Sequence, residues 1–353
     1  MSSLKRDGRQ SNPAISVKNR EIDLSTPSAI RTFSAALRDI VRPEAQRSVL
    51  LTGPSDPDGD SIGASLALAW ALRRHGVTDV TVSGTASSRY AWLPGAPEMV
   101  PDHRVRENYD VVIVVDGDRH RLHPRVARAF ASATARVIVD HHLSTRPVGY
   151  ELSLIVPNAA STCDLVLALL EDWELELDEE VATVLYTGLI FDTGGFRHPN
   201  TLPATFELAA RLLAVGIDHS AITIRVLHER RPPGTRLLGH ALYTAALEGE
   251  LVWSVIRLSD VEQASGVYTD IEGIVDHLLL TEGAELACLF VERGPRRVKL
   301  SLRSRTRVDV SRLARSLNPD GGGHRRAAGL ELATTIDDAL GFVPNVLRAA
   351  IST

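Results

Sequence analysis

The stretch that decides the fold is Arg136-Val137-Ile138-Val139-Asp140-His141-His142, a short β-branched run followed at once by an acid and two imidazoles. Apolar, β-branched runs of this length are typical of strands buried in a parallel sheet. Ligands of open α/β sheets bind beyond the carboxyl ends of the strands, which is where Asp140, His141 and His142 would lie. Taken alone, these three residues would be best explained as an exposed polar turn, so a functional site needs support from the rest of the chain.

A second acidic cluster follows the predicted strand at 48–52 and opens a helix that ends near Gly76. It contains Asp56, Asp58 and Asp60 at alternate positions. A single carboxylate would suffice to cap the helix and complement its dipole. Three carboxylates so close together repel one another, and a bound cation is the simplest way to offset that repulsion. We therefore favour a metal site over a capping role alone.

Two further carboxylates follow apolar segments. Residues 109–115 form the clearest central strand and run directly into Asp116. Asp116 alone could equally be a turn-forming residue. A predicted apolar helix at 179–190 leads to Asp192, where the negative end of the helix dipole disfavours an anion. Asp192 therefore needs a cation or a set of hydrogen-bond donors nearby.

The remaining pattern predicts two α/β domains joined by a linker. Residues 1–25 are polar and lack apolar periodicity, so we expect a disordered tail. Strands alternate with helices over 26–216, which predicts a parallel-sheet domain. Pro232-Pro233-Gly234 is the strongest break in the pattern and places a linker at 217–239. A smaller α/β domain is expected over 240–353.

The composition excludes several classes of protein. The chain has 353 residues, of which 44% are hydrophobic and 24% charged, with a net charge of −5. No global positive charge attracts long nucleic acid, although local cations could hold a small phosphorylated ligand. Cys163 and Cys288 lie in apolar runs and are expected to be buried thiols. With neither a membrane-length apolar stretch nor a signal-peptide core, we expect a cytoplasmic protein that does not bind membranes.

The acids and imidazoles together predict a site for divalent ions. Carboxylate-rich ligation with one or two imidazoles suits Mn²⁺ or Mg²⁺, and no thiolate is available to favour zinc. The candidate ligands are sufficient for two ions, which can activate a water molecule and stabilise both oxygens of a phosphoryl displacement. Asp116, at the end of the central strand, is the natural residue to bridge them. The candidates are Asp56, Asp58, Asp60, Asp116, Asp192, His141 and His142.

The C-terminal part contains a glycine-rich stretch, Gly321-Gly322-Gly323-His324. Such stretches are often only flexible loops. The backbone N–H groups of glycines can also approach a phosphate closely, and His324 and Arg303 would add a donor and a bidentate cation. We favour phosphate binding because Ala327-Ala328-Gly329 follows directly and permits close packing.

In the order and number of these motifs, the chain resembles the DHH phosphoesterases that carry a C-terminal DHHA1 domain. Within this RecJ-like superfamily it is most similar to the oligoribonuclease and 3′-phosphoadenosine-5′-phosphate phosphatase type. The resemblance covers roughly Arg47 to Asp338. The motifs that carry it are Asp56–Gly63, Asp116, Asp140–His142, Asp192–Phe196, Ser301–Ser304, Gly321–His324 and Ala327–Gly329.

The resemblance implies a site with two Mn²⁺ ions in a cleft between the two domains. It assigns Asp58 and Asp192 to one ion, Asp60 and His141 to the other, and Asp116 to both. His142 would orient the site or touch the substrate phosphate, so Asp116, His141 and His142 are the implied catalytic residues. The nucleotide would be bound by Ser301, Arg303, Gly322, Gly323 and His324. The family also suggests a homodimer.

Pro54 departs from the family pattern. The family usually has a His at this position, four residues before the first metal-binding Asp, and a proline side chain has no ligand atom. Asp56 could replace the missing ligand, because the RecJ-like branch has an Asp two residues before the equivalent acid. The site could instead bind one ion weakly, with reduced activity.

We therefore expect a Mn²⁺-dependent phosphoesterase that acts on short nucleotides. The expected substrates are di- to pentanucleotides degraded from the 3′ end, pApA-type dinucleotides and 3′,5′-bisphosphorylated adenosine. Two alternatives stay open, a cyclic-di-nucleotide phosphodiesterase and a metal-deficient nucleotide-binding protein with weak or no catalysis.

Overall fold

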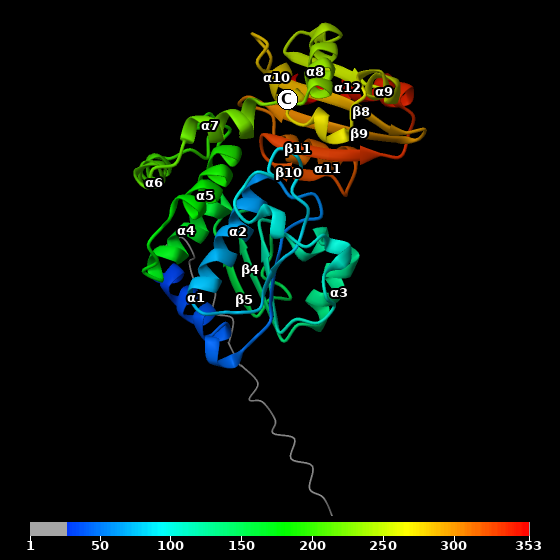
Figure 1. Cartoon of the computed structure of the whole chain (residues 1–353). Coiled ribbons are helices and arrows are strands. Elements are labelled where there is room, and N and C mark those ends of the chain that lie inside the picture. The colour runs from blue at the N-terminus through cyan, green and yellow to red at the C-terminus, as the bar shows by residue number, and fades with distance from the viewer. Residues whose placement is uncertain (1–26, 353) are drawn as a thin grey trace, which may run out of the picture. The chain divides into compact units, whose positions relative to one another are not determined.

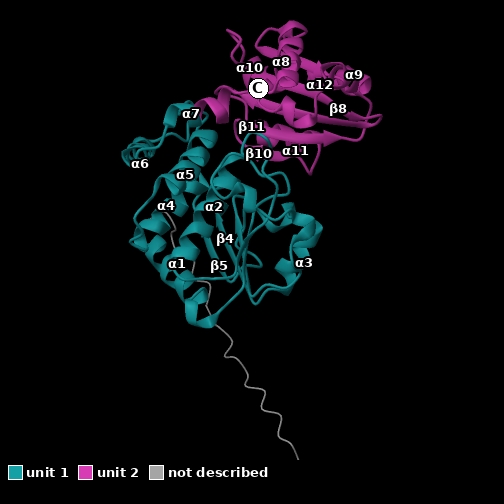
Figure 2. Ribbon diagram, viewed as in Figure 1, with its two compact units in different colours: residues 1–141, 145–222 teal, residues 142–144, 223–353 magenta. Residues whose placement is uncertain are grey.

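The computed structural model describes residues 27–352, so the tail expected over 1–25 lies outside the described residues. The chain divides into two compact units (Figure 2). Of the described residues, the first unit contains 27–141 and Thr145–Ile222, and the second contains His142–Ser144 and 223–352. Within residues 27–352, no helix combines the length and the apolar character needed to cross a membrane.

The first unit is built on a five-stranded parallel sheet, as the sequence predicts (Figure 1). Its strands are β1 (Val49–Thr52), β2 (Val80–Val82), β3 (Val111–Val115), β4 (Ala135–Asp140) and β5 (Leu152–Ile155). They lie in the order β2-β1-β3-β4-β5. Because β2 pairs with one side of β1 and β3 with the other, the loops that follow β1 and β3 separate at the carboxyl end of the sheet. Ligand sites of such sheets form at this point.

Helices cover both faces of this sheet. On one face, Phe130 of α3 packs in a core with Leu50, Val112 and Ile138 of the strands. Helices α1, α2, α4 and α5 gather on the other side (Figure 1). Helix α2 is buried along most of its length because it packs against both α4 and α5. The helices are α1 (Pro27–Ile40), α2 (Gly59–Arg74), α3 (Pro124–Ser132), α4 (Thr162–Asp172), α5 (Glu179–Asp192) and α6 (Pro203–Ala214).

The stretch expected to be a linker is largely helical. Helix α7 (His219–Thr223) continues into a π-helical turn, Ile224–His228, and α8 (Pro232–Tyr243) follows. Pro232-Pro233-Gly234 begins α8 instead of interrupting the chain, because proline is accommodated in the first turn of a helix. The division between the two units lies between Ile222 and Thr223.

The second unit has a six-stranded mixed sheet in the order β10-β11-β9-β8-β7-β6. Only the β7–β8 pair is parallel. The strands are β6 (Ala246–Glu248), β7 (Leu251–Ile256), β8 (Leu286–Gly294), β9 (Arg297–Ser304), β10 (Gly322–His324) and β11 (Ala327–Leu332). The sheet and its helices confirm the smaller α/β domain. The glycine stretch that could have been a flexible loop contributes β10, one strand of a hairpin with β11.

The two faces of this sheet are covered unequally. Helices α11 (Val310–Leu317) and α12 (Ile336–Ser352) pack on one face, in a core with Leu300 and Leu302 of β9. On the other face, α8, α9 (Leu258–Ala264) and α10 (Ile274–Leu279) form a core with residues of β7 and β8. Side chains alternate along a strand, so Ser301 and Arg303 of β9 lie on the second face. That core contains no residue of β9, and both side chains are half-buried.

Candidate active site

The loop between β1 and α2 places two of the predicted metal ligands. Asp58 has an extended backbone and caps α2, because its carboxylate accepts hydrogen bonds from the N–H groups of Asp60 and Ser61, each at 3.1 Å. Asp60 follows in the first turn and is fully buried. Asp56 is exposed, and among the described residues it belongs, like Asp58 and Asp192, to no group of three side chains whose ligand atoms converge. Its ligand role stays a prediction without support from the structure.

The Asp60 carboxylate lies against the first turn of α4. Its Oδ2 accepts from the N–H of Thr162 at 2.6 Å, and its Oδ1 accepts from the N–H of Cys163 at 3.0 Å. Burial raises the pKa of Asp60 to about 7, with a further contribution from the charge of Asp192, while His141 opposes the shift. A buried carboxylate of this kind is costly in charged form unless a cation accompanies it.

Asp116 occupies a strained position directly after β3. Its φ is 54°, in the left-handed region that disfavours residues other than glycine, and Gly117 follows with a φ of 157°. The side chain is buried, and its Oδ1 accepts a hydrogen bond from the Thr162 hydroxyl at 3.1 Å. A non-glycine residue held in this conformation at the end of a buried strand marks a functional position.

His141 faces three carboxylates. Its Nε2 lies 2.9 Å from Asp192 Oδ2, 3.7 Å from Asp116 Oδ1 and 3.9 Å from Asp60 Oδ2. Burial lowers its pKa, but the hydrogen bond to Asp192 and the three negative charges outweigh burial and raise the pKa well above its usual value. The other ring nitrogen, Nδ1, lies 3.2 Å from the carbonyl of Ala159. Nε2 is therefore the nitrogen directed at the acids.

Asp140 has a structural role. Its carboxylate accepts hydrogen bonds from the N–H of His141, at 2.9 Å, and from the hydroxyl of Thr145. These two hydrogen bonds join the start and the end of the loop that contains His142, and the Asp140 side chain is fully buried. His142 is half-buried and groups with the second unit, so its part in the site stays a prediction.

Asp58 completes the acidic group. Burial raises its pKa well above the usual value, and the charges of Asp116 and Asp192 raise it further. Arg121 lies in the helical turn that follows Asp116, and its positive charge lowers the pKa of Asp58. The sequence pattern did not single out Arg121 or Thr162. The only available signal for Thr162 was its place at the start of a predicted apolar helix.

The residues brought together fit a divalent ion. Asp60, Asp116 and His141, all buried, each offer one ligand atom, and these atoms lie within 4.8 Å of one another. Cys163 is adjacent, but burial raises the pKa of its thiol well above the usual value, so no thiolate competes. Oxygen ligands with one imidazole suit Mn²⁺ or Mg²⁺ better than zinc or copper.

The predicted nucleotide-binding residues form one strip in the second unit. Arg303 lies opposite Ala327, which pairs with His324, and Ser301 lies opposite Gly329, which pairs with Gly322. Paired residues of antiparallel strands point to the same face, so the side chains of Ser301, Arg303 and His324 share a face.

Gly323 requires glycine. Its φ is 138°, and a Cβ at this position would lie 2.4 Å from the carbonyl oxygen of Ala327. The glycines of β10 therefore bring its backbone close to β11, beside the face that presents Arg303 and His324. In this structure Arg303 Nε donates to Asp276 Oδ1 at 2.7 Å.

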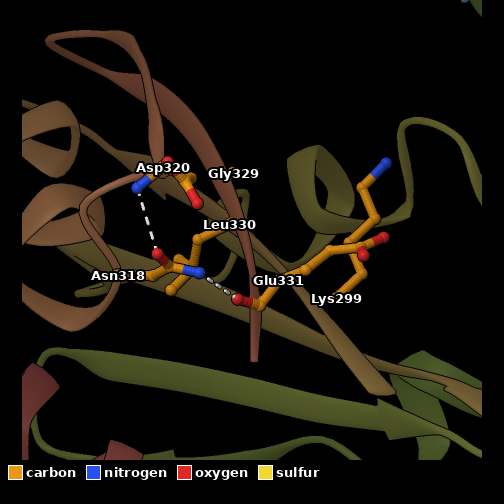
Figure 3. Close-up of a pocket in the computed structure, with 6 residues that line it drawn as sticks. All are labelled: Lys299, Asn318, Asp320, Gly329, Leu330 and Glu331. Carbon is orange, nitrogen blue, oxygen red and sulfur yellow. Dashed lines mark hydrogen bonds between the residues drawn. The ribbon is translucent and has the colours of Figure 1, made fainter. Parts of the chain in front are cut away.

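A hollow of about 440 Å³ lies at β11 (Figure 3). Its lining includes Gly329, which pairs with Ser301 and Gly322 of the strip. The Asn318 side chain lines this hollow, where it donates a hydrogen bond to the carbonyl of Glu331 and accepts one from the N–H of Asp320. Two carboxylates and one ammonium line it, so it is less suited to a phosphate than the strip is. The lining residues are Lys299, Asn318, Asp320, Gly329, Leu330 and Glu331.

Two family models match the chain. Residues 48–189 match the N-terminal domain of the DHH family, and residues 261–352 match the DHHA1 domain. The first matched range contains Asp58, Asp60, Asp116 and His141, and Asp192 lies just beyond its end. The second contains the strip on β9 and β10.

Named and solved relatives are similar over most of the chain. The bifunctional oligoribonuclease and PAP phosphatase NrnA of Thermus thermophilus is 31% identical over 299 residues, 84% of this chain and 88% of the relative. Its counterpart in Bacillus subtilis is 25% identical, covering 78% and 86%. A crystal structure of an exopolyphosphatase-related protein from Bacteroides fragilis superposes with a TM-score of 0.81 at 23% identity, over 90% of this chain and 96% of that chain, and shares the fold.

A metal-dependent relative covers a smaller part. A probable manganese-dependent inorganic pyrophosphatase from Streptococcus thermophilus is 26% identical over 186 residues, 50% of this chain and 59% of the relative.

Proposed function

We propose that this chain, which belongs to the DHH family and carries its DHHA1 domain, is a phosphoesterase that uses divalent metal ions to hydrolyse short oligonucleotides or phosphorylated nucleosides. The observation that carries the proposal is the convergence of Asp60, Asp116 and His141, which are buried and offer ligand atoms within 4.8 Å of one another. The printed activities of the NrnA relatives support the substrate class.

Two Mn²⁺ ions are the proposed cofactor, with Mg²⁺ as the alternative. Asp58 and Asp192 would hold one ion, Asp60 and His141 the other, and Asp116 both. Such ions polarise a phosphoryl oxygen and lower the pKa of a water molecule when bound. The manganese-dependent pyrophosphatase relative supports the choice of metal. Asp56 is a weaker candidate because it is exposed.

The chain's own residues orient the site and bind the substrate. His141 directs Nε2 at the acids because its Nδ1 lies at the Ala159 carbonyl. His142 would orient the site or contact the substrate phosphate. The substrate phosphates would be held by Ser301, Arg303, Gly322, Gly323 and His324. Arg303 would exchange its contact with Asp276 for a charge-assisted bond to phosphate.

Hydrolysis assays on the full chain test this proposal. With Mn²⁺ we expect turnover of pApA or of 3′,5′-bisphosphorylated adenosine, none of long single-stranded RNA, and loss of activity with EDTA. Turnover of a cyclic dinucleotide but of neither linear substrate would favour the cyclic-di-nucleotide phosphodiesterase. Turnover unaffected by EDTA would contradict the metal proposal. Light scattering and cell fractionation test the proposed homodimer and cytoplasmic location.

A second candidate, a nucleotide-binding protein with weak catalysis, is motivated by Pro54. Its ring is buried beside Gly117, the residue after Asp116, where a side-chain ligand would be well placed. Pro54→His should strengthen Mn²⁺ binding and raise kcat if the missing ligand limits the enzyme. Binding of pApA without turnover, in both the native chain and this variant, would support the binding protein instead.

A further inference from the structure

The segment Ala159–Cys163, just before and within the first turn of α4, contacts the proposed metal ligands although it supplies none itself. The N–H groups of Thr162 and Cys163 donate to the two oxygens of Asp60, at 2.6 and 3.0 Å. The Thr162 hydroxyl donates to Asp116 Oδ1 at 3.1 Å. One residue therefore binds two of the acids, through its backbone and through its side chain.

The same segment reaches two further ligands. The carbonyl of Ala159 lies 3.2 Å from Nδ1 of His141. Asn200 donates through Nδ2 to the carbonyl of Ala160, at 2.8 Å, and to the carbonyl of Asp192, at 3.2 Å. The segment therefore contacts Asp60, Asp116 and His141 directly, and Asn200 links its Ala160 carbonyl to the backbone of Asp192.

The segment is itself fixed by hydrogen bonds. Ser161 caps α4, because its hydroxyl oxygen accepts from the N–H of Asp164 at 3.2 Å and its O–H donates to Asp164 Oδ1 at 3.0 Å. The N–H of Ala160 donates to the other carboxylate oxygen of Asp164, at 2.9 Å. Ser161 and Thr162 are fully buried. These bonds to Asp164 hold the segment in addition to its contacts with the ligands.

We infer that Ala159–Cys163 is the positioning segment of the metal site and that Thr162 sets the spacing of Asp60 and Asp116. This inference rests on the proposed function and adds a residue to it. Groups that orient metal ligands commonly contribute about 10- to 100-fold in metal affinity or activity. Without its hydroxyl, Asp116 Oδ1 would lose this donor, and the carboxylate would be freer to rotate away from Asp60.

The test compares Thr162→Val, which keeps the shape and the backbone N–H, with Thr162→Ser, which keeps the hydroxyl. Calorimetric titration should show Mn²⁺ affinity falling by about 10- to 100-fold in Thr162→Val, with a fall in kcat against pApA, and recovery in Thr162→Ser. Unchanged affinity and kcat in a folded Thr162→Val would overturn the inference. If Thr162 were needed only for packing, Thr162→Val would keep more Mn²⁺ affinity and activity than Thr162→Ser, because valine is the better match in volume.

If Thr162→Val melts at a temperature far below that of the native chain, the inference is tested with Asn200→Ala instead. Removing the Asn200 amide releases the carbonyls of Ala160 and Asp192, and the inference expects weaker Mn²⁺ binding in a protein with native circular dichroism. Native affinity in that variant would contradict the positioning role. If the unmodified chain itself binds no Mn²⁺, the proposed function fails first, and the inference falls with it.

Discussion

At the scale of single residues, Asp116 combines three properties that rarely occur together. It has a positive φ, it is buried, and its carboxylate lies within 3.7 Å of His141 Nε2. A φ in this region costs on the order of 1 kcal/mol or more for a non-glycine residue, so the surrounding structure must hold Asp116 there. Gly117 after it has its own positive φ, which lets the chain turn away at once.

Asp116→Asn should remove the proposed shared ligand while keeping nearly the same shape. We expect kcat against pApA to fall by more than about 100-fold, because an amide is a much weaker metal ligand than a carboxylate. Circular dichroism and the melting temperature of the metal-free protein should stay near native values, since the amide keeps the shape of the carboxylate. Near-native turnover would remove Asp116 from the site.

At the scale of elements, α2, α4 and α5 approach so closely that glycines are required between them. A Cβ on Gly188 of α5 would lie 2.3 Å from Cys163 Sγ and 2.6 Å from Asp60 Oδ1. A Cβ on Gly63 of α2 would lie 2.4 Å from the carbonyl oxygen of Val184. The packing of the helices and the position of Asp60 are therefore set by the same contacts.

Gly188→Ala tests this coupling. The added methyl must displace Asp60 or Cys163, so we expect a loss of about 1–3 kcal/mol in the free energy of unfolding together with weaker Mn²⁺ binding. Gly239→Ala in α8 is the matched control, because nothing lies within 4 Å of its Cβ, and it should be neutral or stabilising by up to about 1 kcal/mol. Equal effects of the two changes on metal binding would argue against the coupling.

The elements around the site could be predicted from sequence because their signals are local. The β-branched runs, the acids after them and the apolar helices predicted β1, β3, β4, α2 and α5 within a few residues. The short β10 was missed because its glycines carry no strand signal, and it forms only by pairing with β11. The helical character of 219–229 was predicted and is confirmed, whereas α8 was missed because Pro232 at its start has the same local signal as a break.

Within the site, the sequence indicated which types of residue take part, but it did not indicate which residues contact one another. The acidic clusters marked Asp60, Asp116 and Asp192, which the structure brings near His141, and Asp58, which interacts with Asp116 and Asp192. The same pattern could not separate Asp56, which is exposed, because burial depends on how the loop folds over α2. Thr162 acts through hydrogen bonds to residues 102 and 46 positions away, and a single sequence contains no trace of such pairs.

At the scale of the whole molecule, the buried acidic group makes the stability of the metal-free protein depend on pH. The pKa of Asp60 rises from 3.8 to about 7, chiefly through burial. A carboxyl with a raised pKa in the folded state contributes stability that is full below its unfolded pKa and is lost as the pH rises through its folded pKa. For Asp60 this loss falls between about pH 4 and pH 7. The raised pKa values of Asp58 and His141 act in the same direction.

Asp60→Asn isolates this effect, because asparagine stays neutral at every pH. In metal-free protein we expect the melting temperature of this variant, relative to the native chain, to increase as the pH is raised from about 5 to about 8. Saturating Mn²⁺ should reverse the ranking near pH 8, since the ions bind the deprotonated carboxylates of the native chain. A difference in melting temperature that does not vary with pH would show that the pKa of Asp60 is not raised in the folded protein.

The central claim is that Asp58, Asp60, Asp116, His141 and Asp192 together hold divalent ions, and counting bound Mn²⁺ tests it most directly. Equilibrium dialysis of the full chain near neutral pH, with the metal measured by mass spectrometry, should give two Mn²⁺ per chain, and Asp116→Asn should reduce that number. No saturable binding, or a count unaffected by that substitution, would contradict the account.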